Sequence, residues 1–281
     1  MKKIFLYSLV ILMVIGFVAM KEKPIKIFLA GDSTMADKDK KAYPETGWGM
    51  VLPSYFNDDV VIENHARNGR STRTFISEGR WDFMLERVGK GDFVVIQFGH
   101  NDQSQKKVDR YTPPEDYKNN LKKFITDVRA KGATPILCTP VERRKFDSNG
   151  NFVDQHGIYP NLVREVAKSE KVQLIDMQHT SMDFLIGAGV EGSIQYFLHV
   201  KPGECEKHPD GKEDNTHFKP AGAMEMARLF VEGLTELNIE PLVKNLKPNS
   251  EIKIQNTIPV EGLGKLKKTI NHNMDEGNDK R

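Results

Sequence analysis

Five apolar runs alternate with stretches of helical periodicity, and this alternation restricts the fold more than any other feature of the sequence. The runs are rich in β-branched and aromatic residues, as buried strands are, and they cover residues 25–29, 60–64, 93–98, 134–138 and 172–176. Between them, apolar residues recur with the 3.6-residue period of a helix, most clearly over residues 113–132. Strands that alternate with helices form parallel βαβ units. The sequence therefore predicts an α/β protein, a three-layer sandwich around a parallel sheet.

The first twenty residues have the pattern of a secretory signal peptide. Lys2 and Lys3 precede an apolar run from Ile4 to Val18, which is the order of a basic n-region and an h-region. An uncleaved N-terminal anchor is the alternative, although the run is short for a membrane span. We predict an exported protein, periplasmic or secreted, with a signal peptide at 1–20, one folded domain at 21–245 and a partly mobile extension at 246–281.

Charge and composition argue against two classes of partner. The chain of 281 residues carries a net charge of +2, and loss of Lys2 and Lys3 with the leader would bring the mature chain to zero. A basic surface is the first requirement for nucleic-acid binding, so we expect no nucleic-acid partner. With 38% hydrophobic and 28% charged residues, the composition is typical of a soluble globular domain, so we expect no membrane association after signal cleavage. The oligomeric state stays open.

The cysteines and one polar loop are candidates for a disulfide or a metal site. Cys138 ends an apolar run and reads as a small buried hydrophobe, whereas Cys205 lies in a polar stretch, and the sequence leaves their pairing open. His208 lies near Cys205, but no spacing there matches a set of metal ligands. Residues 147–150, Asp-Ser-Asn-Gly, resemble the start of a calcium loop, but they lack its distal acidic residue and predict a turn. We predict no metal site.

A serine follows the first predicted strand. The run 25–29 leads into Ala-Gly-Asp-Ser-Thr-Met at 30–35, and Gly31 allows the backbone to turn there without a side-chain clash. Ser33 is therefore expected just beyond the carboxyl end of a strand, where open α/β sheets bind their ligands. A serine hydroxyl is a weak nucleophile, so it needs a nearby base, together with hydrogen-bond donors for the oxyanion that its attack creates.

Three further polar segments could supply these groups, because each follows a predicted strand or precedes the last helix. They are Asn-Gly at 68–69, Gly-His-Asn-Asp at 99–102 and Asp-Asn-Thr-His at 214–217. Carboxyl ends of parallel strands share one edge of a sheet, so the segments should converge. Taken singly, each residue reads as a cap, a turn residue or an ordinary surface side chain.

The residue types match the needs of acyl transfer. Ser33 would be the nucleophile, His217 the base and Asp214 the acid that orients the imidazole. The backbone N–H groups of Ser33 and Gly69, with the side-chain amide of Asn101, would form the oxyanion hole.

The order of these residues resembles that of the SGNH, or GDSL-type, hydrolase superfamily, whose name lists the serine, glycine, asparagine and histidine found here at 33, 69, 101 and 217. The resemblance runs from about residue 25 to about residue 237, which makes 21–245 an SGNH hydrolase domain. It implies a flavodoxin-like parallel sheet and a Ser–His–Asp esterase mechanism without a metal or nucleotide cofactor. Finer motifs resemble the rhamnogalacturonan acetylesterase branch, carbohydrate esterase family 12; they lie at 31–35, 47–49, 68–71, 99–102, 216–218 and 222–223.

Several further side chains around these motifs are candidates for contact with a sugar chain: Asp32, Trp48, Arg70, Arg73, His100 and Asp102. Each has a structural alternative. Trp48 could equally belong to the core, Arg70 could pair with a surface acid, and His100 could be a structural histidine beneath the oxyanion donors.

The sequence predicts an exported serine esterase that removes O-acetyl groups from an acetylated polysaccharide or oligosaccharide. The resemblance implies a plant cell-wall polymer, with the rhamnogalacturonan of pectin as first choice and acetylated xylan as an alternative. A lipase or thioesterase of the same fold is the second hypothesis, and a carbohydrate-binding protein without activity is the third.

Overall fold

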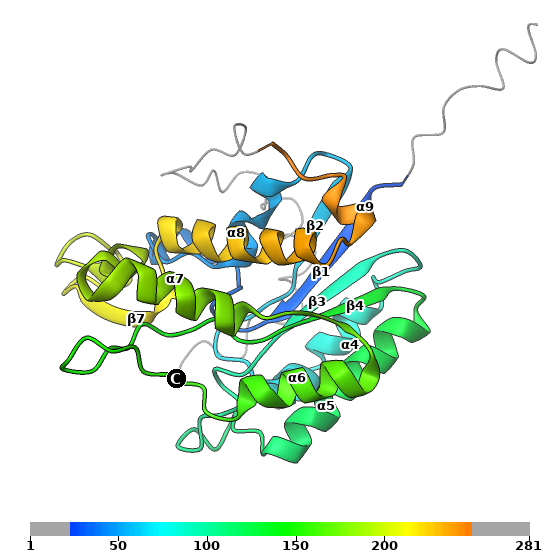
Figure 1. Ribbon diagram of the computed structural model, residues 1–281, viewed down its shortest axis with the longest axis horizontal. Coiled ribbons are helices and arrows are strands. Elements are labelled where there is room, and N and C mark those ends of the chain that lie inside the picture. Colours follow the sequence, from blue (N-terminus) through cyan, green and yellow to red (C-terminus); the bar gives the residue numbers. More distant parts are fainter. Residues whose placement is uncertain (1–22, 249–281) are drawn as a thin grey trace, which may run out of the picture.

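The computed structural model describes residues 23–248, and a five-stranded parallel sheet lies at its centre (Figure 1). The strands are β1 (Ile25–Gly31), β2 (Val60–Asn64), β3 (Phe93–Gln97), β4 (Thr134–Cys138) and β5 (Gln173–Ile175). Their order is β2-β1-β3-β4-β5, and every neighbouring pair is parallel. This is the flavodoxin-like order of doubly wound sheets. The predicted fold class is therefore confirmed.

Helices connect the strands and cover both faces of the sheet. They are the 3₁₀ turns η1 (Lys40–Ala42), η2 (Leu52–Tyr55) and η3 (Ile194–Tyr196), and the α-helices α2 (Trp48–Val51), α3 (Thr72–Ser77), α4 (Arg80–Leu85), α5 (Pro114–Ala130), α6 (Tyr159–Glu170), α7 (Met177–Gly192), α8 (Pro220–Glu236) and α9 (Glu240–Val243). In Figure 1, α7, α8 and α9 lie on one side of the sheet, and α4, α5 and α6 lie on the other.

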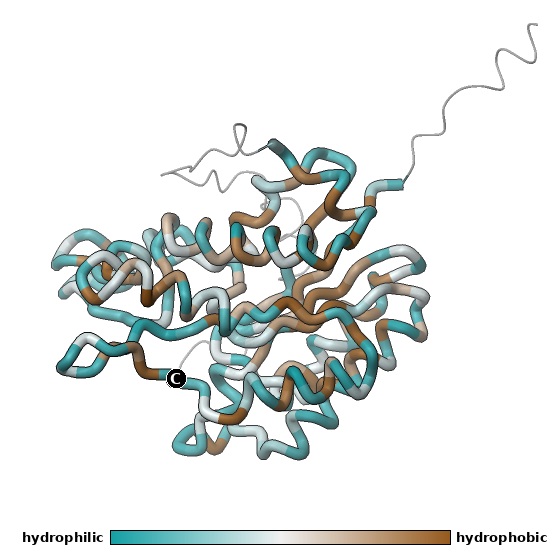
Figure 2. The backbone as a smooth tube through the Cα atoms, viewed as in Figure 1, coloured by the Kyte–Doolittle hydropathy of each residue, from teal (hydrophilic) through white to brown (hydrophobic). Residues whose placement is uncertain are grey.

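Two separate hydrophobic cores explain why the strands are apolar along their whole length. Alternate residues of a strand point to opposite faces. In β3, Val95 packs in the core beneath α2, α7 and α8, whereas Val94 and Ile96 pack in the core beneath α3, α4, α5 and α6. Figure 2 shows the hydrophobic colour concentrated along the sheet and on the inner sides of the helices. A sheet buried on both faces cannot show the polar alternation of a half-exposed one.

The helix α5 shows how the local sequence pattern determines the buried face and the ends of a helix. Its apolar residues all lie on the buried side, and they are Tyr117, Leu121, Phe124, Ile125 and Val128. The helix starts at Pro114, whose missing N–H would be unpaired at that position in any case. It ends before Gly132, which adopts a left-handed φ of 71° that glycine takes without strain. The predicted helix over 113–132 is confirmed.

The predicted histidine, His217, lies on a strand that the sequence does not predict. Residues 201–215 are a long polar segment in the sequence, but the structure forms an antiparallel ribbon of β6 (Phe197–Val200) and β7 (Lys212–Phe218) there. In β7 only Phe218 is buried, so the strand lacks the apolar alternation by which strands are recognised. Pairing with β6, across a turn of eleven residues (201–211), makes it a strand.

The last described residues, beyond the predicted domain end at 245, still contact the rest of the domain. Leu246 pairs with Phe56 in an isolated β-bridge, and the N–H of Lys247 donates to the carbonyl of Tyr55 at 2.8 Å. The packed domain therefore reaches at least two residues past the predicted end at 245. The predicted signal peptide at 1–20 lies outside the described residues, as does the predicted extension beyond residue 248.

The structure also tests the predictions for the two cysteines and for the loop at 147–150. Cys138 and Cys205 are both buried free thiols, so they do not pair. The predicted turn at 147–150 is present, where the Asp147 carboxylate accepts hydrogen bonds from the backbone N–H groups of Asn149 and Asn151.

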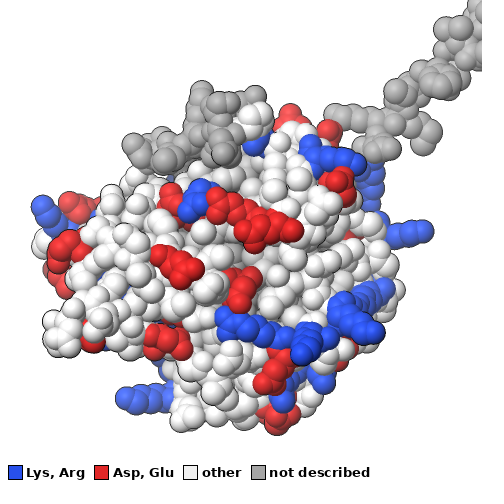
Figure 3. Space-filling view, in the orientation of Figure 1, with Lys and Arg blue, Asp and Glu red and all other residues white. Residues whose placement is uncertain are grey.

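Within residues 23–248, no helix has the length and apolar character needed to cross a bilayer. The face in Figure 3 carries charges of both signs, with acidic side chains over α8 and basic ones near α6.

We predict that Gly222→Ala destabilises the protein by about 1–3 kcal/mol. A Cβ at Gly222, in the first turn of α8, would overlap the backbone carbonyl oxygen of Tyr196. Gly187→Ala is the matched control, because a Cβ there meets nothing within 4 Å on exposed α7. It should raise stability by about 0.5–1 kcal/mol, since alanine is the better helix former. Chemical denaturation of both variants measures this, and equal effects would contradict the steric argument.

Candidate active site

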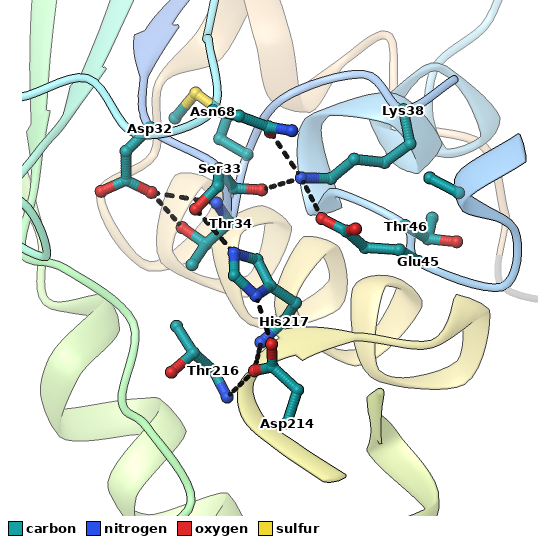
Figure 4. A network of polar contacts seen from close by, with 12 residues as sticks. Asp32, Ser33, Thr34, Lys38, Glu45, Thr46, Asn68, Asp214, Thr216 and His217 are labelled. Atoms are coloured by element: carbon teal, nitrogen blue, oxygen red, sulfur yellow. Dashed lines mark hydrogen bonds and ion pairs between the residues drawn. The ribbon is translucent and has the colours of Figure 1, made fainter. Parts of the chain in front are cut away.

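The four predicted polar segments meet at one end of the sheet. Figure 4 shows three of them, represented by Ser33, Asn68 and His217 with Asp214. Ser33 follows β1, and His217 lies on β7, 184 residues further along the chain. The Nε2 atom of His217 lies 2.9 Å from the hydroxyl oxygen of Ser33. The side-chain amide of Asn101, beyond the end of β3, donates to the carbonyl of Arg70, next to Gly69, at 3.0 Å. The structure thus brings all the predicted chemical groups together.

A continuous chain of hydrogen bonds joins the acid, the imidazole and the hydroxyl. The carboxylate of Asp214 lies 2.8 Å from Nδ1 of His217 and also accepts from the backbone N–H groups of Thr216 and His217. Burial alone would raise the pKa of Asp214, but these hydrogen bonds and the imidazole hold it well below its usual value. Asp214 therefore stays ionised, and it orients the imidazole with Nε2 toward Ser33.

A second buried carboxylate shapes the turn that carries Ser33. Asp32 accepts from the backbone N–H and the hydroxyl of Thr34, both at 2.9 Å, and lies 3.0 Å from Nδ1 of His100. Burial would raise the pKa of Asp32, but His100 and Thr34 lower it to about 2. Burial also lowers the pKa of His100, so a neutral imidazole donates Nδ1–H to an ionised Asp32. Asp32 therefore ties the serine turn to the loop after β3.

The predicted oxyanion donors are free to serve a ligand. Within residues 23–248, the backbone N–H groups of Ser33 and Gly69 donate to no other group. Asn101 uses one of its two amide protons on the carbonyl of Arg70, which leaves the second available. Gly69 has a left-handed φ of 75°, where a side chain would be strained, and a Cβ there would lie 2.8 Å from Nη1 of Arg110.

A buried ion pair that the sequence does not predict lies on the other side of Ser33. The ammonium of Lys38 contacts three acceptors: the Ser33 carbonyl at 2.5 Å, the Asn68 side-chain oxygen at 2.8 Å and the Glu45 carboxylate at 2.9 Å. Both charged side chains are almost fully buried. Burial would raise the pKa of Glu45, but Lys38 and His217 lower it to about 2. No sequence signal marks these residues, since a lysine in a polar loop ordinarily faces water.

Three of the predicted sugar-contacting residues are instead structural. Asp32, Trp48 and Asp102 are fully buried, so a sugar chain at the surface cannot touch their side chains. Trp48 packs against Phe230 and donates its ring N–H to Gln97 at 3.1 Å, which is the core position considered as its alternative. These three residues belong to the site motifs because they support the site through contacts inside the protein.

The other candidates lie closer to the surface. His100 is 4% exposed and holds Asp32, as a structural histidine would. Arg70 pairs with Glu78 at 2.9 Å, the surface ion pair considered for it. Arg73 donates to the carbonyl of Val108 at 2.6 Å. None of these three contacts depends on a ligand. Within residues 23–248, no cluster of three or more His, Cys, Asp or Glu side chains is arranged to hold a metal ion.

Comparison with known proteins agrees with the geometry. The sequence profile of the GDSL-like lipase/acylhydrolase family matches residues 29–223. This is more than half of the chain, so the chain belongs to that family, and the predicted family is confirmed. The chain is also similar to "Rhamnogalacturonan acetylesterase RhgT" of Bacillus subtilis, with 40% identity over 227 residues, which are 81% of this chain and 96% of the relative. The family and this relative support the class of carboxylic ester hydrolases.

Solved structures share the fold. The crystal structure of YxiM from Bacillus subtilis superposes with a TM-score of 0.66 at 28% identity, over 77% of this chain and 58% of that one. An acetylxylan esterase from Geobacillus stearothermophilus, Axe2, superposes with a TM-score of 0.55 at 19% identity, over 76% of this chain and 96% of that one. At that identity the second likeness shows the fold alone.

We predict that the contributions of Lys38 and Glu45 to the free energy of unfolding are coupled. Lys38→Met would leave the Glu45 carboxylate buried without its main partner, which should cost about 3–5 kcal/mol of stability. Lys38→Met/Glu45→Gln should recover most of that loss, because no unpaired charge remains. Urea denaturation of wild type, both single variants and the double variant measures the coupling. Additive losses would contradict the inferred pairing.

We predict that Asp102→Asn changes how stability depends on pH. One oxygen of Asp102 accepts from the N–H and hydroxyl of Thr72, at the start of α3, while the other is buried without a partner. Burial raises the pKa of Asp102 from 3.8 to about 6. The folded state thus holds a proton more tightly than the unfolded state, so this residue's contribution to stability falls as pH rises from about 4 to about 6.

Asparagine does not titrate, so the stability of Asp102→Asn relative to wild type should rise over that interval, by at most about 3 kcal/mol. Melting temperatures of both proteins at pH 4, 5, 6 and 7 check the slope. A difference that is flat with pH would contradict it.

Proposed function

We propose that this protein is an exported serine esterase that removes O-acetyl groups from a plant cell-wall polysaccharide, with rhamnogalacturonan as its preferred polymer. The observation that carries the proposal is the unbroken hydrogen-bond chain from Asp214 through His217 to Ser33. Membership of an acylhydrolase family supports the chemistry, and similarity to a rhamnogalacturonan acetylesterase supports the substrate. Export is proposed from the leader pattern of residues 1–20 alone.

Acylation would begin at the Ser33 hydroxyl. His217 takes the proton on Nε2 as the oxygen attacks the acetyl carbonyl carbon, and the imidazolium is stabilised by Asp214 at 2.8 Å. The carbonyl oxygen becomes an oxyanion, which can accept from the free N–H groups of Ser33 and Gly69 and from the second amide proton of Asn101. Collapse of the tetrahedral intermediate breaks the ester C–O bond, and His217 returns the proton to the leaving sugar oxygen.

Deacylation would repeat these steps with water. His217 removes a proton from a water molecule, whose oxygen attacks the acetyl-Ser33 carbonyl, and the same donors stabilise the oxyanion. Acetate leaves and Ser33 regains its proton from His217. All the acid, base and oxyanion roles in both halves would fall to residues of this chain, of which Asp214, His217 and Ser33 are already hydrogen-bonded in the required order.

The surroundings of Ser33 favour a polar substrate over a lipid. The partly exposed side chains around Ser33 are polar and include Asn68, Asp214 and His217. A long acyl chain needs an apolar channel, and these groups do not supply one. Removal of acetyl groups from xylan remains the alternative function among carbohydrate esterases. Axe2, a structural neighbour of this protein, is named as an acetylxylan esterase.

We predict that Ser33→Ala and His217→Ala each lower the turnover of an acetyl ester by about four to six powers of ten, and that the double variant is no slower than either single variant. The members of the hydrogen-bond chain act as one unit, so their losses should not add. Release of acetate from 4-nitrophenyl acetate and from acetylated pectin measures this. Comparable rates in wild type and Ser33→Ala would discard the assignment.

The same assay separates the rival functions. A series of nitrophenyl esters of growing acyl length should show the highest kcat/KM for acetate. A preference that rises with chain length would favour the lipase or thioesterase hypothesis. Pectin binding without any hydrolysis by the wild-type protein would favour the non-catalytic binding hypothesis.

A further inference from the structure

A pocket that the mechanism does not use lies beside the candidate active site. It has a volume of about 310 Å³, and its lining includes His100, Gln103, Arg143, Gln155, His156 and Tyr159. His100 and His156 stack edge to face at 4.6 Å between ring centres. Burial lowers the pKa of both imidazoles, so both are neutral. Arg143 is therefore the one charged side chain among the residues that line this pocket.

The segment of Arg143 and Arg144 contacts both the loop that follows β3 and the strand β7. The Nη2 atom of Arg143 donates to the carbonyl of His100 at 3.1 Å, one residue before the predicted oxyanion donor Asn101. On the other side, the N–H of the next residue, Arg144, donates to the carbonyl of Asn215 at 2.9 Å, one residue after Asp214. The guanidinium is thus held at the oxyanion loop, while the backbone of the same segment contacts the strand that carries the imidazole. A ligand at Ser33 would have this pocket as its neighbour.

The charge of Arg143 has no counter-ion of its own. Within residues 23–248 its guanidinium forms no ion pair, and the His100 carbonyl is its one hydrogen-bond acceptor. The adjacent Arg144 differs, because its three guanidinium nitrogens donate to Ser193, Val190 and Asn215. Burial lowers the pKa of Arg143, and the more distant charges of Asp32, Glu142 and Asp214 oppose that shift. Four of the five N–H donors in the fork remain for a ligand.

A second guanidinium lies across the site. A Cβ on Gly69 would be 2.8 Å from Nη1 of Arg110, so this cation lies directly over the predicted oxyanion glycine. Its Nε and Nη2 donate to Asp109, its neighbour in sequence, whose side chain is 64% exposed. Nη1 makes no contact with that carboxylate. Two guanidinium groups therefore approach the oxyanion loop from different segments.

We propose that Arg143, assisted by Arg110, binds the carboxylate of a uronic acid residue next to the acetylated sugar, and so selects acidic acetylated polysaccharides over neutral ones. A planar guanidinium with free N–H donors matches a carboxylate in charge and geometry. A pocket of about 310 Å³ can hold one sugar ring. This inference rests on the proposed esterase function, and it names the chemical feature of the polymer that the site recognises.

The opposing interpretation is that Arg143 only balances the buried carboxylates of Asp32 and Asp214. The two roles predict different kinetics. A cation that balances internal charge would, when lost, slow every substrate by the same factor. A cation that binds a uronate would slow only substrates that carry the carboxylate.

The test compares acetate release from two forms of one acetylated rhamnogalacturonan oligosaccharide, with its carboxylates free or converted to methyl esters. Wild type should prefer the free form by about ten- to a hundredfold in kcat/KM, the usual range for a charge-assisted hydrogen bond. In Arg143→Gln that ratio should fall to about one. Arg143→Lys should keep part of it, because lysine retains the charge without the planar fork.

Arg129→Gln is the matched control for the loss of one positive charge. Arg129 lies at the end of α5, at the opposite edge of the sheet, where it donates to the carbonyls of Glu170 and Lys171. Its variant should keep the wild-type ratio. Arg143→Gln with a ratio equal to that of wild type, or a wild type without any preference, would overturn the inference.

Binding tests the subsite without catalysis. The Ser33→Ala variant is titrated with an unacetylated rhamnogalacturonan oligosaccharide in a calorimeter, and Ser33→Ala/Arg143→Gln should bind about tenfold or more weakly. Equal affinities would overturn the subsite even if the wild type is a good esterase. A wild type that releases no acetate from any ester, together with the expected binding difference, would overturn the proposed function and leave the subsite standing.

Discussion

The buried carboxylate of Asp32 is the constraint on which the candidate site depends. It is inaccessible to water, yet it remains ionised, because Thr34 and His100 supply hydrogen bonds that replace its hydration. Those bonds join the turn after β1 to the loop after β3, two strands that pair directly in the sheet. The position of Ser33 relative to Asn101 therefore follows from one satisfied charge rather than from loop packing alone.

A second buried charge completes this support from the other side. Lys38 holds the carbonyl of Ser33 and the side chain of Asn68, and Glu45 neutralises it. Such pairs are expensive to bury and add little net stability, so their value here is geometric. Lys38 ties the backbone of Ser33 to Asn68, the residue before Gly69, and so fixes these two segments relative to each other before any substrate arrives. Donors fixed in advance stabilise an oxyanion without reorganisation, which is the largest contribution in this kind of chemistry.

The imidazole reaches the site by a different route. It belongs to the polar strand β7 of an antiparallel ribbon outside the main sheet, and its orientation comes from Asp214 on the same strand, three residues away. The positions of the proposed nucleophile and oxyanion donors thus depend on the sheet and on buried charges, while the position of the proposed base depends on local hydrogen bonds in β7. The segment of Arg143 joins these two halves through His100 and Asn215, which is why a subsite for an acidic sugar there would lie beside the reacting groups.

Local pattern was enough for the five strands of the parallel sheet, for α5 and for the order of the site motifs, because a doubly covered parallel sheet leaves continuous apolar runs and puts its ligands beyond the strand ends. The tertiary structure alone decided that Trp48, Asp32 and Asp102 are buried, that Lys38 and Glu45 pair, and that 212–218 is a strand. Burial of a polar group and pairing of a polar strand depend on partners far away in sequence. A motif can name the chemical groups, but only the fold shows what surrounds them.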